Sequence, residues 1–300
     1  MAVLDPNEIF YTAFEPKQQN RFILYVDGIP SYQIKGMGAE VFNRFPDLVE
    51  QANKEVGYSL SDICLEDPNS QLGQTQFTQP ALYLVSYLEA QKHLEDGQSP
   101  GLAAGHSVGE FAALAFAGCM SFIDGLRMVS KRGEIMSKVS GGGMAAVIGL
   151  DVEVIRSTLT ESGIDQVDLA NFNSPGQIVL SGPANQIQSI LTPLKDAGAR
   201  MVVPLKVSGA FHSRMMQSPA NEFENFLKDF SFSNPNFPVY SNVEASPYQS
   251  ADAIAPLLVS QIHSSVLWSD TIIRMRNDGA DEFLECGPGN VLSKLLRQIP

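Results

Sequence analysis

The sequence predicts an α/β protein with a large domain, built on a mostly parallel sheet, and a small inserted domain. Three observations lead to this prediction. Apolar runs that favour strands alternate with helix-forming segments along most of the chain, which is typical of parallel sheets. The apolar run 102–104 leads through Gly105-His106-Ser107-Val108-Gly109 into a helix-forming segment. Residues 144–207 have a strand and helix order of their own.

The first part of the large domain is expected to span residues 21–143, after an N-terminal extension at 1–20. Pro80 is placed in the first turn of its helix, where backbone N–H groups have no partners within the helix. The three glycines at 141–143 favour a hinge at the end of this part. The expected elements are a strand at 21–26 and helices at 39–52 (despite Pro46), 80–88, 110–117 and 121–137.

Residues 144–207 are expected to form the inserted small domain. The order of its predicted elements is β-α-β-β-α-β, which is the order of a ferredoxin-like subdomain. The strands are expected at 145–150, 167–172, 177–181 and 201–207, with helices at 152–162 and 183–197.

The chain is then expected to return to the large domain over residues 208–300. Strands that alternate with helices predict a parallel sheet whose ligands bind at the carboxyl ends of the strands. The expected elements are strands at 237–243 and 282–286 and helices at 251–263, 268–278 and 290–298.

Composition supports a large folded core and argues against several classes of partner. The 300 residues are 44% hydrophobic, and a net charge of −13 disfavours binding to nucleic acid or an anionic membrane. We found no signal-like segment and no apolar run long enough to cross a membrane, so we expect a soluble cytoplasmic protein. We also expect a monomer. No metal or bound cofactor is expected, because no metal-ligand spacing occurs among Cys64, Cys119, Cys286, His93, His106, His212 and His263.

The segment 105–109 has the G-x-S-x-G pattern of a nucleophile elbow, which favours an α/β-hydrolase-like large domain. Glycine is needed on both sides of the serine because the turn from strand to helix is sharp. Ser107 is therefore the candidate nucleophile. The backbone N–H of Val108, at the start of the following helix, is a candidate donor to an oxyanion.

A serine nucleophile needs a base, and His212 follows the last strand of the small domain. The hydrolase order of serine, acid and histidine would place an orienting carboxylate between Ser107 and His212. Histidine 106 lies inside the elbow and is expected to support the turn. Three carboxylates are available for the orienting role, Asp124, Asp168 and Asp196.

Several short motifs occur together in one order, and together they are far more specific than the elbow alone. They are His106 and Glu110 around the elbow, Thr78-Gln79-Pro80-Ala81, Lys131-Arg132-Gly133-Glu134, Ala210-Phe211-His212-Ser213 and Glu285-Cys286-Gly287-Pro288-Gly289. Over residues 22–297 the chain resembles malonyl-CoA:acyl carrier protein transacylases, and most of all the free-standing acyltransferases that serve polyketide synthases. The resemblance implies a malonyl-CoA substrate and a phosphopantetheinylated carrier protein as partner.

The resemblance also implies roles for individual residues. His212 would be the base, oriented by the main-chain carbonyl of Gln261, and Arg132 would bind the malonyl carboxylate through two parallel hydrogen bonds. Phe211 would crowd an α-methyl group and so favour malonyl over methylmalonyl. The remaining expected residues of the acyl pocket are Gln79, His106 and Met136. An acidic carrier protein would need a local basic patch, for which the nearby candidates are Lys131, Arg132, Lys206 and Arg214.

The loop after the first strand departs from the family pattern. It reads Gly28-Ile29-Pro30-Ser31-Tyr32-Gln33 where the family has a glycine-glutamine-glycine-serine-glutamine loop. An ungapped count places Pro30, which has no N–H, at the position of the second oxyanion donor. A one-residue insertion would give that role to Ile29 instead.

Three functions follow from these residues. The first is a malonyltransferase that forms an ester on Ser107. The second is an acyl hydrolase that clears carrier proteins, and the third is a non-catalytic partner that has lost its oxyanion site. Arg132 favours the first, because an enzyme for monocarboxylic acyl groups has no use for it.

Overall fold

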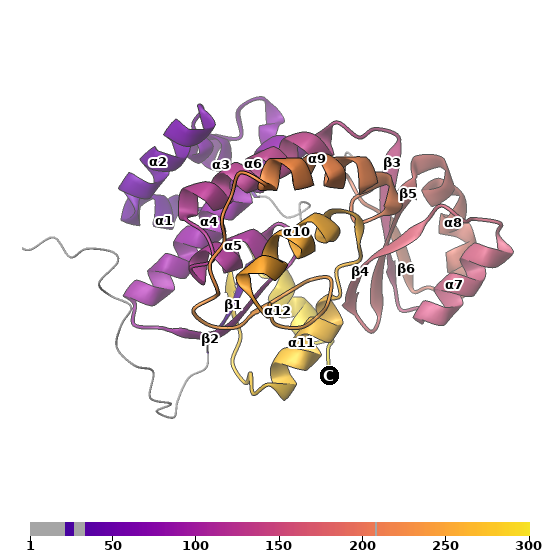
Figure 1. The fold of residues 1–300 in the computed structure, drawn as a ribbon. Helices are drawn as coiled ribbons and strands as arrows, with labels where there is room; N and C mark the ends of the chain where they lie inside the picture. Colours follow the sequence, from indigo (N-terminus) through magenta and orange to yellow (C-terminus); the bar gives the residue numbers. More distant parts are fainter. Residues whose placement is uncertain (1–21, 27–33, 208) are drawn as a thin grey trace, which may run out of the picture.

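The computed structural model describes residues 22–26, 34–207 and 209–300 (Figure 1). The described residues form two four-stranded sheets, each with its own cover of helices. This is the α/β fold with an inserted ferredoxin-like part that the sequence predicts. The exact division at residues 143 and 208 stays a prediction.

The large sheet has the strand order β7-β2-β1-β8, and all its neighbouring strands are parallel. Residues of β2 alternate between its two faces, as strand geometry requires. Ala103 packs into the main core cluster, whereas Leu102 and Ala104 pack with Trp268 on the opposite face. The strands are β1 (Phe22–Val26), β2 (Pro100–Gly105), β7 (Val239–Tyr240) and β8 (Leu284–Cys286).

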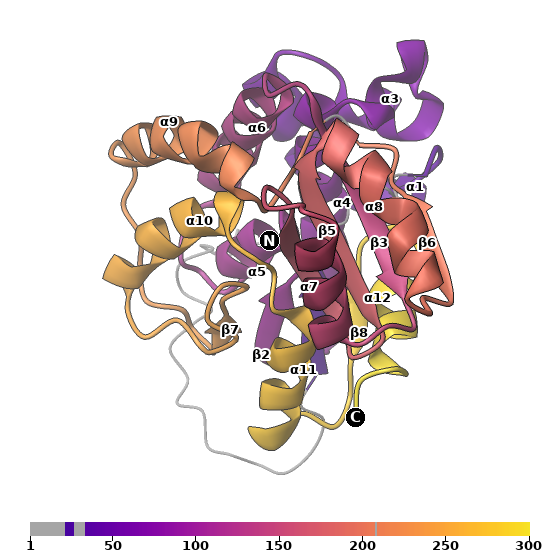
Figure 2. The ribbon, with the colours of Figure 1, turned by 90° about the vertical axis from the view of Figure 1, so that its right-hand side faces the viewer.

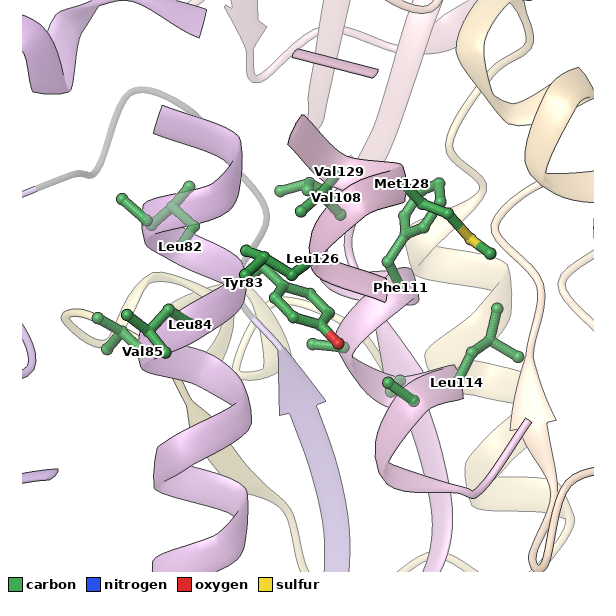
Figure 3. Packing of buried hydrophobic residues seen from close by; sticks show 14 of the residues in the cluster. Leu82, Tyr83, Leu84, Val85, Val108, Phe111, Leu114, Leu126, Met128 and Val129 are labelled. Atoms are coloured by element: carbon green, nitrogen blue, oxygen red, sulfur yellow. The ribbon is translucent and has the colours of Figure 1, made fainter. Parts of the chain in front are cut away.

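Helices cover both faces of this sheet, and the main core lies between the sheet and α4, α5 and α6. Figure 3 shows the contact of α4 with α5 and α6, where Tyr83 points toward the two neighbouring helices. The Tyr83 hydroxyl donates to the carbonyl of Phe122 at 2.9 Å. The helices are α1 (Ala39–Arg44), α2 (Pro46–Val56), α3 (Leu60–Glu66), α4 (Thr75–Glu95), α5 (Gly109–Phe116), α6 (Phe122–Ser137), α9 (Gln217–Leu227), α10 (Ile254–His263), α11 (Trp268–Asn277) and α12 (Val291–Leu296).

The small sheet has the order β4-β5-β3-β6, and all its neighbouring strands are antiparallel. Helices α7 and α8 lie on its outer face (Figure 2) and close a separate apolar core. Its elements are β3 (Gly142–Ile148), α7 (Val152–Glu161), β4 (Asp168–Ser174), β5 (Gln177–Pro183), α8 (Ala184–Asp196) and β6 (Met201–Pro204).

The small sheet contacts the large domain just after the end of α10. The N–H of Val266 donates to the carbonyl of Ala170 at 2.8 Å, and the N–H of Phe172 donates to the carbonyl of Val266 at 2.9 Å. Strand β4 of the small sheet is thereby hydrogen-bonded to the segment that follows α10. This contact fixes the small domain against the element that carries Gln261.

Three local expectations are wrong. The helix expected at 39–52 is two helices, because Pro46 disfavours helical geometry at Phe45 and starts α2 itself. Helix α4 begins at Thr75, so Pro80 lies inside it and Gln79 is helical rather than in a turn. The glycines expected as a hinge belong in part to β3, where a side chain on Gly142 would lie 2.4 Å from the Ala210 nitrogen.

None of the helices in the described ranges has both the length and the apolar character that a bilayer span requires.

Candidate active site

Ser107 lies at the turn between β2 and α5 in a strained backbone conformation. Its φ of 53° is in the left-handed region, which non-glycine residues rarely occupy outside functional turns. A Cβ on Gly105 would come within 2.0 Å of the Gly109 carbonyl carbon, so the turn excludes a side chain there. Both features are those of a nucleophile elbow.

Asn242, which follows β7, supports the elbow from the neighbouring strand. Its side-chain oxygen accepts a hydrogen bond from the Ser107 N–H at 2.7 Å, and its side-chain nitrogen donates to the carbonyl of Gly105 at 2.5 Å. Asn242 was not anticipated from the sequence. The only available signal was its place after a strand that pairs with β2, because no local motif marks it.

The structure brings Ser107, His212 and Gln261 together. Ser107 Oγ lies 2.8 Å from His212 Nε2, and His212 Nδ1 lies 2.7 Å from the main-chain oxygen of Gln261. A carbonyl can only accept, so Nδ1 carries the proton and Nε2 is free to accept one from serine. Burial and the nearby Arg132 guanidinium lower the pKa of His212 to about 3, which keeps the free imidazole neutral.

In the described part of the chain, no carboxylate accepts a hydrogen bond from Nδ1 of His212. Asp168 instead forms a two-pronged ion pair with Arg214, with its closest contact at 2.6 Å. Asp124 lies near the start of α6, where it accepts from Ser121, and Asp196 lies at the exposed end of α8. The geometry is therefore that of a Ser-His pair oriented by a main-chain carbonyl.

Arg132 is a buried cation beside the nucleophile, with only 1% of its surface exposed. One terminal nitrogen donates to Gln79 Oε1 at 2.8 Å. The other donates to Ser107 Oγ at 3.2 Å and to Gln261 Oε1 at 2.9 Å. Burial lowers its pKa to about 9, so the guanidinium remains charged at neutral pH.

The pocket in front of Ser107 contains the expected lining residues. Its walls combine apolar side chains from both domains with a few polar groups, and His106 contacts Asn173 there at 2.9 Å. The residues are Gln79, His106, Ser107, Arg132, Met136, Met144, Asn171, Asn173, Val179, Leu205, Val207, Phe211 and His212. Asn171 and Asn173 were not anticipated, because they lie on β4 of the small domain without a distinctive motif.

Two buried polar atoms at this pocket have no hydrogen-bond partner among the described residues. They are Nδ1 of His106 and Nε of Arg132. Burial lowers the pKa of His106 to about 4, so its ring is neutral and Nδ1 is an acceptor. Unpaired buried polar groups are costly, and a ligand in this pocket could supply the missing hydrogen bonds.

Only one of the candidate oxyanion donors, Val108, lies among the described residues. Val108 directly precedes α5, and the first N–H groups of a helix lack partners within it. Ile29 and Pro30, the two candidates for the second donor, lie outside the described residues.

The thiols and carboxylates do not suggest other chemistry. All three cysteines are buried, and burial raises the pKa of Cys64 and Cys119 to about 12, so these thiols are protonated and poor nucleophiles. In the described ranges, no group of three or more His, Cys, Asp or Glu side chains is arranged to hold a metal ion.

Most of the expected basic patch is neutralised or buried. Lys131 pairs with Glu134 and Glu222, while Arg214 pairs with Asp168 and Arg132 faces the pocket. Lys206 is exposed and forms no ion pair with the described residues. It lies between Leu205 and Val207, both of which line the pocket.

A family model for the acyl transferase domain matches residues 32–299. The chain belongs to the acyl transferase domain family. It is 47% identical over 271 residues to the polyketide biosynthesis malonyl CoA-acyl carrier protein transacylase BaeC of Bacillus velezensis, covering 89% of this chain and 93% of that protein. It is also 47% identical over 268 residues to the polyketide biosynthesis protein ThaF of Burkholderia thailandensis, covering 89% of this chain but only 23% of ThaF.

A solved structure of the same fold agrees with this assignment to the acyl transferase family. It shows PlMCAT:AntF (holo), a type II PKS acyl-carrier protein in complex with its malonyl-transacylase, and matches with a TM-score of 0.88 at 36% identity. The match covers 93% of each chain. The family resemblance seen in the sequence is thus confirmed.

Proposed function

We propose that this protein is a malonyltransferase that moves a malonyl group from malonyl-CoA, through an ester on Ser107, to the phosphopantetheine thiol of an acyl carrier protein. It would serve polyketide or fatty acid biosynthesis; the relatives BaeC and ThaF are both named as polyketide biosynthesis proteins. The observation that carries the proposal is the buried Arg132 guanidinium, 3.2 Å from Ser107 Oγ in a largely apolar pocket. A buried cation beside the nucleophile suits an acyl group that ends in a carboxylate.

In the first step, Ser107 Oγ attacks the thioester carbonyl while its proton passes to His212 Nε2. The N–H of Val108 stabilises the oxyanion that forms. When the tetrahedral intermediate collapses, the carbon–sulfur bond breaks and the CoA sulfur leaves with the proton from His212. The product is a malonyl ester on the enzyme and free CoA thiol.

In the second step, the carrier-protein thiol gives its proton to His212 and attacks the ester carbonyl. The serine oxygen then leaves and recovers that proton, and malonyl ends as a thioester on the carrier. The Gln261 carbonyl holds the ring in place throughout. It stabilises the imidazolium less than a carboxylate would, and Arg132 destabilises it further, so the proton returns readily to the departing sulfur or oxygen.

The hydrolase alternative differs only in the final acceptor. The test is to mix the enzyme with malonyl-CoA and a phosphopantetheinylated acyl carrier protein and to measure the intact mass of the carrier. The matched control is the same carrier without its phosphopantetheine. A malonyl adduct on the modified carrier alone supports the transferase. Release of CoA and malonate with no adduct on the carrier would make the protein a hydrolase.

A further inference from the structure

Glu110 is a fully buried carboxylate, three residues after the nucleophile, and the mechanism above does not use it. Its Oε1 accepts a hydrogen bond from the Tyr248 hydroxyl at 2.5 Å and from the Asn242 N–H at 3.2 Å. Its Oε2 accepts from the side-chain nitrogen of Gln261. The N–H groups of Asn242 and Gln261 can only donate, so this environment fits an ionised carboxylate.

Gln261 connects this carboxylate to the acyl-binding cation. Its side-chain nitrogen contacts Glu110, and its side-chain oxygen accepts from Arg132 at 2.9 Å. The described residues contain no carboxylate within ion-pair distance of Arg132. The acidic group linked to Arg132 is therefore Glu110, through the side-chain amide of Gln261. The Arg132 guanidinium is balanced in charge and still has hydrogen-bonding capacity for a carboxylate on the acyl group.

We propose that Glu110 is a positioning residue that sets acyl-group specificity. Acting through Gln261, it controls how strongly Arg132 holds a carboxylate at the end of the acyl chain. The inference rests on the proposed malonyltransferase function and adds to it. Because Glu110 and a bound malonyl carboxylate share one buried cation, each weakens the hold of the other.

Because the Glu110 carboxylate and the malonyl carboxylate weaken each other's interaction with Arg132, the affinity for malonyl depends on whether Glu110 is protonated. Burial raises the pKa of Glu110 to about 7, against the opposing effects of its three hydrogen bonds and of Arg132. A bound malonyl carboxylate raises that pKa further, so malonyl is held best below about pH 7 and less well above it. An acetyl group has no charge and is insensitive to this change.

The other groups around Glu110 do not titrate in the same range. Tyr248 faces it from the segment after β7, and burial raises the pKa of that phenol well above 10. Arg132 on α6 keeps its charge, and the pKa of Cys119, near Tyr248, is about 12. His212, held by α10, has a pKa of about 3 and stays neutral. A transition near neutrality that affects only malonyl would therefore report on Glu110.

The test is the ratio of malonyl to acetyl acylation rates of Ser107 between about pH 5.5 and 8.5. Intact-protein mass spectrometry follows both adducts, and the ratio cancels the shared chemistry of Ser107 and His212. We expect the wild-type ratio to fall by at least about fivefold as the pH rises through Glu110 ionisation. Glu110→Gln cannot titrate and should show a ratio that is independent of pH.

Two further variants keep the proposal falsifiable. Tyr248→Phe removes a hydrogen bond that favours ionised Glu110, so the transition should move to higher pH. Glu89→Gln is the matched control. Burial also raises the pKa of Glu89 to about 7, but Glu89 accepts its hydrogen bond from the Gly287 N–H and not from Gln261. Its ratio should follow the wild-type profile.

The outcomes separate the two proposals. A transition that persists in folded Glu110→Gln, or that disappears in Glu89→Gln, overturns the role of Glu110. If Glu110→Gln does not fold, an unchanged midpoint in Tyr248→Phe overturns it. A wild-type protein that takes up no malonyl at any pH overturns the malonyltransferase function itself, and the specificity role fails with it.

Discussion

Replacing Arg132 with alanine should reverse the preference of the enzyme between malonyl and acetyl groups. The guanidinium is 1% exposed, so water cannot replace it as a partner for the malonyl carboxylate. Removing one member of a buried, hydrogen-bonded charge pair costs about 2 to 5 kcal/mol. At about 1.4 kcal/mol per tenfold, malonyl transfer should slow by about 30-fold to several thousandfold.

Acetyl transfer makes no use of that contact and should be unchanged or improved relative to malonyl transfer. The variant also removes the hydrogen bonds that Arg132 donates to Gln79 Oε1 and Gln261 Oε1, and it removes the cation near buried Glu110, so it should also destabilise the fold. A ratio of the two substrates, measured on the same folded sample, removes this effect from the comparison.

The assay is competition between malonyl-CoA and acetyl-CoA for Ser107, scored by intact mass. Arg132→Lys keeps the charge but not the planar fork, so its malonyl preference should be intermediate. Lys131→Ala, at a partly exposed residue of the same helix that pairs with Glu134 and Glu222, should leave the preference unchanged. If Arg132→Ala lowered both rates by the same factor, Arg132 would be a structural residue and the malonyl assignment would lose its physical support.

Three other predictions test the remaining parts of the site. His212→Ala should slow acylation by several orders of magnitude, whereas Asp168→Asn should matter little; a collapse of activity in folded Asp168→Asn would support an acid-oriented triad instead. Phe211→Ser should let methylmalonyl-CoA compete better, by the 1 to 3 kcal/mol or so that a pocket methyl is worth, and unchanged competition would remove Phe211 from size selection. Stability should fall as the pH drops from about 6.5 towards 4, because burial holds the pKa of His106 near 4 while the unfolded chain takes up its proton near 6.5. Urea unfolding of His106→Asn should show a shallower loss, because only His212, whose pKa is lowered to about 3, then contributes in the same way, and an equally steep loss in the variant would refute the role of His106.

The elements predicted from local patterns agree best with the structure. The spacing of Gly105 and Gly109 marks the sharp turn, because any side chain at Gly105 would collide with the helix that follows. The β-α-β-β-α-β order gives the small sheet, since that order has one common antiparallel arrangement. Both features depend on residues that are close in sequence.

The missed features depend on distant residues or on competing local effects. Asn242 contacts Ser107 and Tyr248 contacts Glu110, each across more than 130 positions, and nothing in the sequence around Asn242 or Tyr248 indicates these contacts. Helices α3 and α9 were not anticipated at all. Gln261 was anticipated through its main chain, which the family resemblance implied, but its side-chain link between Glu110 and Arg132 appears only in the structure.

The most direct test of the central claim is the intact mass of the protein after brief mixing with malonyl-CoA. The account predicts one malonyl adduct on the wild-type protein, located at Ser107 by peptide mapping, and none on Ser107→Ala. Ser137→Ala, at a partly exposed serine at the end of α6, is the control and should acquire the adduct normally. An adduct that persists in Ser107→Ala, or no adduct on the wild-type protein, would contradict the account.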